Sequence, residues 1–352
     1  MFKKVQKIPH ITAHFWGVIW GRGLNPYEGV PQFEQEGFAS YYEANIKDYV
    51  RQYEARRIKA LKKTRKRFLT FVPLYLLIVA ACVLYIIHGV NTPGEDVEFA
   101  FWGIIAATAI FYGFVRHYIR RYKKRVKGRI FPVIFRYFGE SYSYSADVGY
   151  SIDTLKPWGI VPDYDRVNTE DLVRGSYKDV AIELFEAHLQ KESRDKDNKR
   201  RYHTVFKGLC ITLSVNKNFR GKTVIVKDRG IFNIFAKNRH MKGLSTVKLE
   251  DPHFEKKFEV FSNDQIEARY LLTTSFMKRL MDLVEILKAK GVQCSFYKEK
   301  LLIMLPAKKN FFEPGSIFEP ATFEHDIKTI LEEMKIIFDI VDILKLNQNI
   351  GL

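Results

Sequence analysis

The acidic side chains of the segment 249–273 are the ones in this sequence best suited to chemistry. Asp251, Asp264 and Glu267 lie within it, and two neighbouring carboxyl groups can serve as general acid and general base. A structural role is open to each of them as well. Asp251 with Pro252 can start a short turn, Ser262 or Asp264 can cap the helical turn that follows, and Glu267 can pair with Arg269. The sequence favours the structural role and leaves these three as the candidate catalytic residues.

Glu186 and His188 form the second pair to consider. They lie two residues apart in an apparent strand, so they share one face of it, and their side chains suit a metal ion or acid–base work. No further ligand cluster accompanies them, and we therefore expect a solvated pair with no metal and no cofactor. Residues 221–223 resemble the end of a phosphate-binding loop, but Asn216 stands where that motif needs glycine.

Two apolar stretches govern where these groups can act. Residues 68–90 contain 23 uncharged residues, and a shorter stretch covers residues 99–115. About 20 apolar residues in a helix cross a bilayer, and soluble helices of this length normally keep a polar face. The sequence therefore predicts a transmembrane hairpin rather than two buried helices.

The charges that flank the hairpin predict its orientation. The loop 91–98 has no basic residue and three acidic ones, so the positive-inside rule places it outside and both termini in the cytoplasm. Basic residues near the membrane also attract anionic lipids of the cytoplasmic leaflet. The flanking basic residues are Lys62, Lys63, Arg65, Lys66, Arg67, Arg116, Arg120, Arg121, Lys123 and Lys124.

The net charge of +17 would by itself suggest nucleic-acid binding. Its distribution argues against this, because residues 1–129 hold 22 Lys and Arg against 9 Asp and Glu, while the rest holds 35 against 31. The excess therefore belongs mainly to the membrane flanks, and we expect no nucleic-acid partner.

Small residues recur at four-residue spacing in the second apolar stretch. Gly103 and Ala107 form one pair, and Ala109 and Gly113 form another. Such spacing allows close approach of a second helix. That helix is either the first apolar stretch of the same chain, which the short loop favours, or a second copy in a homo-oligomer.

The remainder of the chain predicts an α+β fold. Apolar residues alternate in 180–185 and 209–215 around a charged tip, which indicates a hairpin. A second hairpin is expected from 294–297 and 301–305, and helical spacing covers 274–289 and 323–345. Strands that precede helices, with hairpin connections, favour a mainly antiparallel sheet with helices on one face. The expected domains are an irregular N-terminus (1–30), the hairpin with flanking helices (31–139) and a cytoplasmic α+β domain (140–352).

Several motifs resemble a bacterial family of membrane proteins known as a domain of unknown function. They are Phe206-Lys207-Gly208, then Asn218 to Thr223, and finally Leu249 to Thr273, which reads LEDPxFExxFxVxSxDxxEARYLLT. The resemblance covers roughly residues 55–346 and includes the paired spans. It implies a bacterial inner-membrane protein and assigns no catalytic residue.

These observations favour a membrane-anchored binding or scaffold module that is not an enzyme. Its cytoplasmic domain would bind a protein partner, a lipid head group or a small ligand. One alternative is a membrane-tethered hydrolase that uses the carboxylates of 249–273, and a pocket with converging acidic groups would favour it. Another alternative is an accessory subunit of a transport complex.

Overall fold

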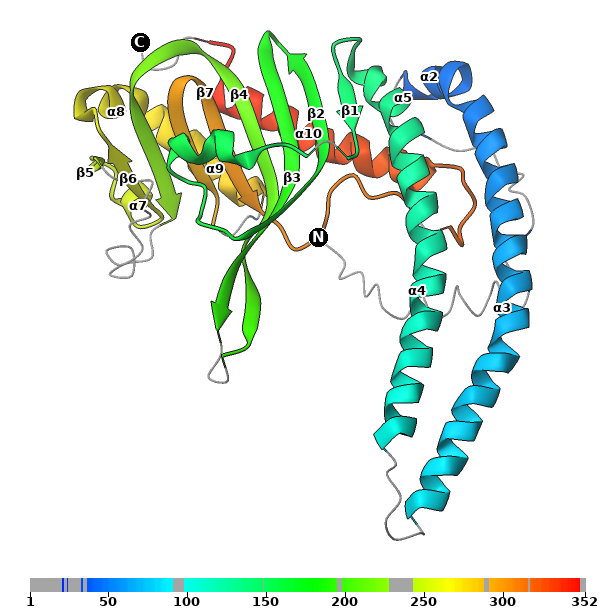
Figure 1. Ribbon diagram of the computed structural model, residues 1–352. Helices are drawn as coiled ribbons and strands as arrows, with labels where there is room; N and C mark the ends of the chain where they lie inside the picture. Colours follow the sequence, from blue (N-terminus) through cyan, green and yellow to red (C-terminus); the bar gives the residue numbers. More distant parts are fainter. Residues whose placement is uncertain are drawn as a thin grey trace. The chain divides into compact units, whose positions relative to one another are not determined.

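The computed structural model describes the chain as two compact units (Figure 1). Unit 1 comprises Met1–Val133 with Pro314–Ile327, and unit 2 comprises Ile134–Glu313 with Lys328–Leu352. The described residues are 21, 24, 33, 37–90, 98–147, 149–194, 198–227, 243–287, 291–315 and 317–348, with the side chains of 111, 112, 114–119 and 287 excepted. Nearly all of the predicted N-terminal segment 1–30, and the loop residues 91–97, lie outside them.

Unit 1 is helical. Helix α2 (Phe38–Asn45) is followed by α3 (Lys47–Val90), and α4 (Glu98–Arg129) returns beside α3. The two long helices are antiparallel, since Tyr53 near the start of α3 donates to the Arg125 carbonyl oxygen and Tyr75 lies 3.0 Å from Thr108 between their hydroxyl oxygens. The helical continuation expected on either side of the apolar stretches is thus present.

Helix α3 is long and apolar enough to cross a membrane, and none of its apolar window is buried within the protein. Among the described residues, the apolar part of α4 is shorter and covers Glu98–Ile110. The remaining residues of the predicted second span, 111–115, are helical, but most of their side chains lie outside the description.

Among its described residues, unit 2 is built on a seven-stranded antiparallel sheet with the order β1-β2-β3-β4-β6-β5, and β7 also pairs with β4. Its longest strand, β4, contacts β3, β6 and β7. The strands are β1 (Ser143–Ser145), β2 (Arg166–Tyr177), β3 (Val180–Arg194), β4 (Arg200–Lys227), β5 (Ser245–Val247), β6 (Phe258–Ser262) and β7 (Gln293–Pro306).

Helical segments cover both faces of this sheet. On one face the 3₁₀ segment η2 (Ile152–Trp158) packs its apolar side chains on those of β3, β4 and β7. On the other, Phe276 of α9 (Thr274–Leu287) meets Phe296 of β7 edge to face. On that face Phe338 of α10 (Glu324–Leu344) stacks on Tyr177, with ring centroids 4.4 Å apart. Figure 1 shows α9 and α10 on the same side of the sheet, which confirms the predicted α+β class. The smaller helical pieces are α5 (Phe131–Phe135), η1 (Arg136–Phe138), α7 (Pro252–Glu255) and α8 (Gln265–Leu271).

The structure confirms the first predicted hairpin and corrects the second. Strands β3 and β4 pair as expected around the charged tip. The segment 294–305 is one continuous strand instead of two. Lys298 adopts φ 56° within it, opposite two register shifts in β4, so its charged tripeptide 298–300 marks a bulge rather than a turn. The segment between η1 and β2 contains β1 and η2.

Candidate functional site

The candidate carboxylates of 249–273 bind backbone N–H groups. The Asp251 side chain accepts hydrogen bonds from the N–H groups of His253 (2.8 Å) and Phe254 (3.1 Å), and so caps α7. Asp264 accepts from the Glu267 N–H at 2.9 Å and caps α8. A side-chain acceptor at this position satisfies a donor that the helix itself leaves unpaired. Their catalytic assignment stays a prediction that the geometry does not favour.

Glu267 accepts hydrogen bonds from the backbone of the neighbouring strand β4 instead of pairing with Arg269. Its two carboxylate oxygens accept from the N–H groups of Arg220 (3.1 Å) and Gly221 (2.8 Å) in β4. A Cβ at Gly221 would lie 2.8 Å from Asn263 Oδ1. The backbone of β4 therefore approaches α8 closely, and the glycine that resembled a phosphate loop serves this packing.

Glu186 and His188 have separate partners in β3. Glu186 is buried and accepts a hydrogen bond from the Phe311 N–H. His188 Nε2 lies 2.9 Å from Thr204 Oγ1 on the adjacent strand. The two side chains do not belong to the group of metal-ligand type that the described residues contain.

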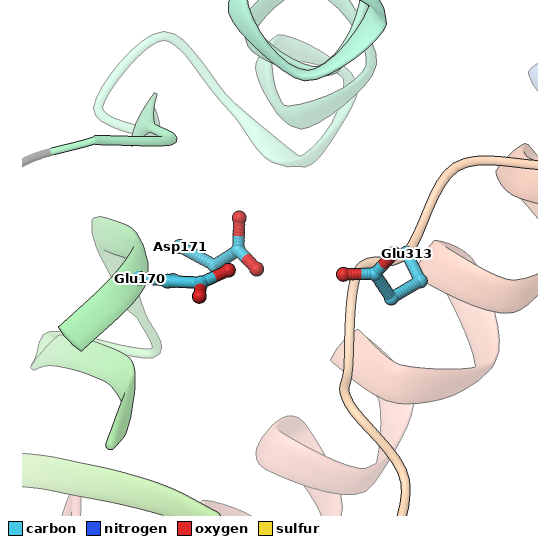
Figure 2. A group of neighbouring side chains, drawn as sticks. All are labelled: Glu170, Asp171 and Glu313. Carbon is cyan, nitrogen blue, oxygen red and sulfur yellow. The ribbon is translucent and has the colours of Figure 1, made fainter. Parts of the chain in front are cut away.

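That group consists of Glu170, Asp171 and Glu313 (Figure 2). One carboxylate oxygen from each lies within 4.8 Å of the other two. Asp171 is fully buried, with φ 59°, at a register shift between β2 and β3. Aspartate tolerates this left-handed conformation better than most residues, and the bulge turns its side chain to the same region as that of Glu170.

Tyr144 completes this acidic group from β1. Its hydroxyl donates to Asp171 Oδ1 at 2.5 Å, and its ring stacks on Phe135 with centroids 5.0 Å apart. Burial, followed by the charge of Asp171, raises the pKa of Tyr144 well above its usual range. The tyrosine therefore stays a hydrogen-bond donor. Carboxylate oxygens at this spacing are the kind of ligands that Ca²⁺ or Mg²⁺ prefers, so this is the place in the described structure where a hard cation would fit best.

Sequence reasoning missed this acidic group for a simple reason. Glu170 and Asp171 are adjacent in a strand and would normally point to opposite faces. Only the bulge brings them together, and Glu313 comes from a distant loop. No spacing pattern in the sequence marks such a group.

The small residues of α4 are divided between two environments. A Cβ at Gly103 would lie 3.4 Å from Cys82 Sγ of α3, and Ala107 is also half-buried. Gly103, Ala106 and Ala107 line one side of an apolar groove of about 410 Å³ between α3 and α4. Ala109 and Gly113 are exposed. The first pair therefore packs within the hairpin, and a homo-oligomer through either pair stays a prediction.

Comparison with protein families gives a match in the C-terminal part of the chain. Residues 204–346 match the family "Protein of unknown function (DUF3137)". This confirms the resemblance to a domain of unknown function. The matched segment runs from β4 to α10 and does not include the apolar helices.

No curated protein matches the chain. Among solved structures, the mycobacterial trehalose monomycolate transport factor A, TtfA, is similar with 15% identity over 62% of this chain and 97% of that chain. Its TM-score of 0.34 is too low to assign a common fold.

Proposed function

We propose that the protein is a membrane-anchored binding or scaffold module of a bacterial inner membrane. Its helical hairpin would hold the DUF3137 segment at the cytoplasmic surface, where that segment binds a protein, a lipid head group or a small ligand. The observation that carries the proposal is the exposure of α3. Leu77, Leu84 and Val90 are 68%, 67% and 73% exposed along its apolar part.

Such exposure supports a lipid environment. Soluble proteins rarely expose contiguous apolar surfaces beyond a few hundred Å². The apolar surface of α3 continues on α4, where Phe99, Trp102 and Ile110 are 81%, 66% and 74% exposed. Transfer of this surface from water to hydrocarbon stabilises the protein by roughly 25 cal/mol per Å².

The charges at one end of the hairpin support the proposed orientation. Lys62, Lys63 and Lys66 are exposed on α3 just before its apolar part, and Arg120 and Arg121 are exposed on α4 after its apolar part. The antiparallel pairing of the helices brings both groups to the same end. Each such residue gains about 1 kcal/mol near an anionic leaflet, so this end would face the cytoplasm.

The binding role, rather than catalysis, is supported by the acidic residues of 249–273. Asp251 and Asp264 cap helices, and Glu267 binds two N–H groups of β4. The carboxylates that would serve a hydrolase are thus engaged by backbone. No observation favours the transport-subunit alternative over a general scaffold.

The orientation is tested with single cysteines and a membrane-impermeant maleimide in intact cells. Thr92→Cys, in the loop, should be labelled, whereas Lys256→Cys, at the exposed end of α7, should be labelled only after permeabilisation. The native Cys210 and Cys294 are buried, and the unaltered chain measures the background, including Cys82. Labelling of Lys256→Cys in intact cells would contradict the proposal.

A further inference from the structure

A cavity of about 260 Å³ with a mixed polar and apolar lining lies in unit 1. Gly315 and residues 319–326 provide most of its wall, and Tyr122 of α4 provides the rest. The loop 315–326 is closed on itself, because Asp326 near its end accepts a hydrogen bond from the Gly315 N–H at 2.5 Å. Compact loops whose ends meet are frequently functional.

A buried ion pair fixes this loop to α3. Arg57 is 1% exposed and donates to both oxygens of Glu54, at 2.6 and 2.7 Å. Arg57 also donates to the Ile317 carbonyl oxygen at 3.2 Å, and Glu54 accepts from the Ala321 N–H at 2.8 Å. A bidentate pair with these additional bonds is strong and directional. The cavity wall is therefore held in place by the helix beneath it.

Asp326 is the buried acidic group of this cavity. It lines the cavity, is 6% exposed, and makes no ion pair with any residue in the described part of the chain. The pKa of Asp326 is raised to about 6, mainly by burial; the Gly315 hydrogen bond and His325 oppose this rise, Glu319 adds to it and Lys123 opposes it. At neutral pH the cavity thus contains a buried negative charge, and such a charge is costly without a counter-charge.

Aromatic rings complete the cavity. Tyr122 and Phe323 both line it. Burial and then the Asp326 charge raise the pKa of Tyr122 above its usual range, with Arg57 lowering it and Glu54 raising it, so the phenol stays neutral. An aromatic face attracts a cation within about 6 Å of its centroid. A carboxylate beside aromatic rings is a suitable environment for an organic cation.

We propose that this cavity binds a small organic ammonium ion, with its charged nitrogen against the Asp326 carboxylate and its carbon atoms against Tyr122 and Phe323. A bare metal ion fits less well. The cavity is much larger than one ion, and among the described residues Asp326, Glu319 and Glu324 do not form a group of converging ligand atoms. The proposal goes beyond the anchoring role and does not depend on it.

The test is isothermal titration of the full chain in detergent with methylammonium, ethanolammonium and 1,4-diammoniobutane at pH 7.5. At least one of these probes should bind the wild-type chain. Asp326→Asn should weaken that binding at least tenfold, because the amide oxygen still accepts from Gly315 while the charge is lost. Glu332→Gln, an exposed position further along α10, is the matched control and should bind like the wild type.

Two further measurements separate a cation site from a general effect of the substitution. The wild-type affinity should fall about tenfold per pH unit below pH 6 as Asp326 is protonated. The Asp326→Asn profile should lack this fall, and since His325 is present in both proteins its titration cancels. Tyr122→Leu should also weaken binding, whereas Tyr122→Phe should not.

Three results would overturn the proposal. The first is that none of the three probes binds the wild-type chain. The second is equal affinity of the wild type and Asp326→Asn. The third is a wild-type affinity that stays level between pH 7.5 and 5, which would leave the charge of Asp326 without a role. If circular dichroism shows that Asp326→Asn does not fold, the two Tyr122 variants test the proposal instead. Equal binding by Tyr122→Leu and Tyr122→Phe would then overturn it.

Discussion

Asp264 illustrates how a single polar side chain supports local structure in unit 2. Its carboxylate caps α8 by accepting from the Glu267 N–H, and Glu267 in turn holds β4. We expect Asp264→Ala to lower the free energy of unfolding by about 0.5–2 kcal/mol, as loss of a cap does. Urea unfolding of the full chain in detergent measures it. Asp264→Asn keeps an acceptor and should stay close to wild type; an equal loss in both variants would contradict the capping role.

Asp326 gives a pH dependence of stability. Its pKa is about 6 in the folded chain, above the usual value for aspartate, so the folded state holds the proton more tightly. The contribution of Asp326 to the free energy of unfolding is fully present below about pH 4 and is lost as the pH rises to about 6. Above that pH the contribution stays constant. Without added ammonium, we expect Asp326→Asn to be more stable than wild type at pH 7 by about 2–3 kcal/mol, and equal to it near pH 4.

The check on this pH dependence is the difference between the wild-type and Asp326→Asn curves from urea unfolding at several pH values. Other groups that titrate in the same range occur in both proteins and cancel. A difference that stays constant from pH 4 to 7 would show that burial does not raise the pKa of Asp326.

Residue roles that depend on local sequence could be predicted, and those that depend on tertiary contacts could not. Asp251 precedes Pro252 and Asp264 precedes a helical turn, so a turn at the first and a cap at the second could be expected from neighbouring residues alone. Glu267 accepts a hydrogen bond from Arg220 of β4, which lies 47 residues away in the sequence. The acidic group needs a bulge at Asp171 and a residue from a distant loop.

At the scale of elements, Gly208 permits β4 and β7 to approach each other. Its φ is 154°, and a Cβ there would lie 2.1 Å from the Leu305 carbonyl oxygen. Backbone atoms of a hydrogen-bonded strand cannot withdraw cheaply, so we expect Gly208→Ala to destabilise unit 2 by about 3 kcal/mol or more. Gly149→Ala, where nothing lies within 4 Å, is the control. Thermal unfolding followed by circular dichroism measures both, and similar midpoints would contradict this packing.

Strand β4 and its neighbours β3 and β7 show why the first predicted hairpin was correct and the second was wrong. The tip between β3 and β4 is a true reversal with a charged sequence. The segment around Lys298 is equally charged, but the exposed bulge there lets both strands continue. Charge in a strand pattern indicates exposure, which a turn and a bulge share, so sequence alone does not separate them.

At the scale of the whole chain, a helix long and apolar enough to cross a membrane could be anticipated, because this property depends on length and composition alone. The 44-residue α3 contains the whole first apolar stretch. The division into two units follows from contacts instead, since the segment Pro314–Ile327 belongs to unit 1 although it lies far along the chain. Arg57, Glu54 and their bonds to residues 317 and 321 account for that contact.

The most direct test of membrane anchoring is flotation of cell membranes in a density gradient after an alkaline carbonate wash. We expect the full chain to float with the lipid, because the proposed anchoring places α3 in the hydrocarbon. Leu77→Lys with Leu84→Lys should leave it in the soluble fraction, while Lys62→Gln with Lys63→Gln should still float. Recovery of the unaltered chain as a dissolved, monodisperse protein after the wash would contradict the account.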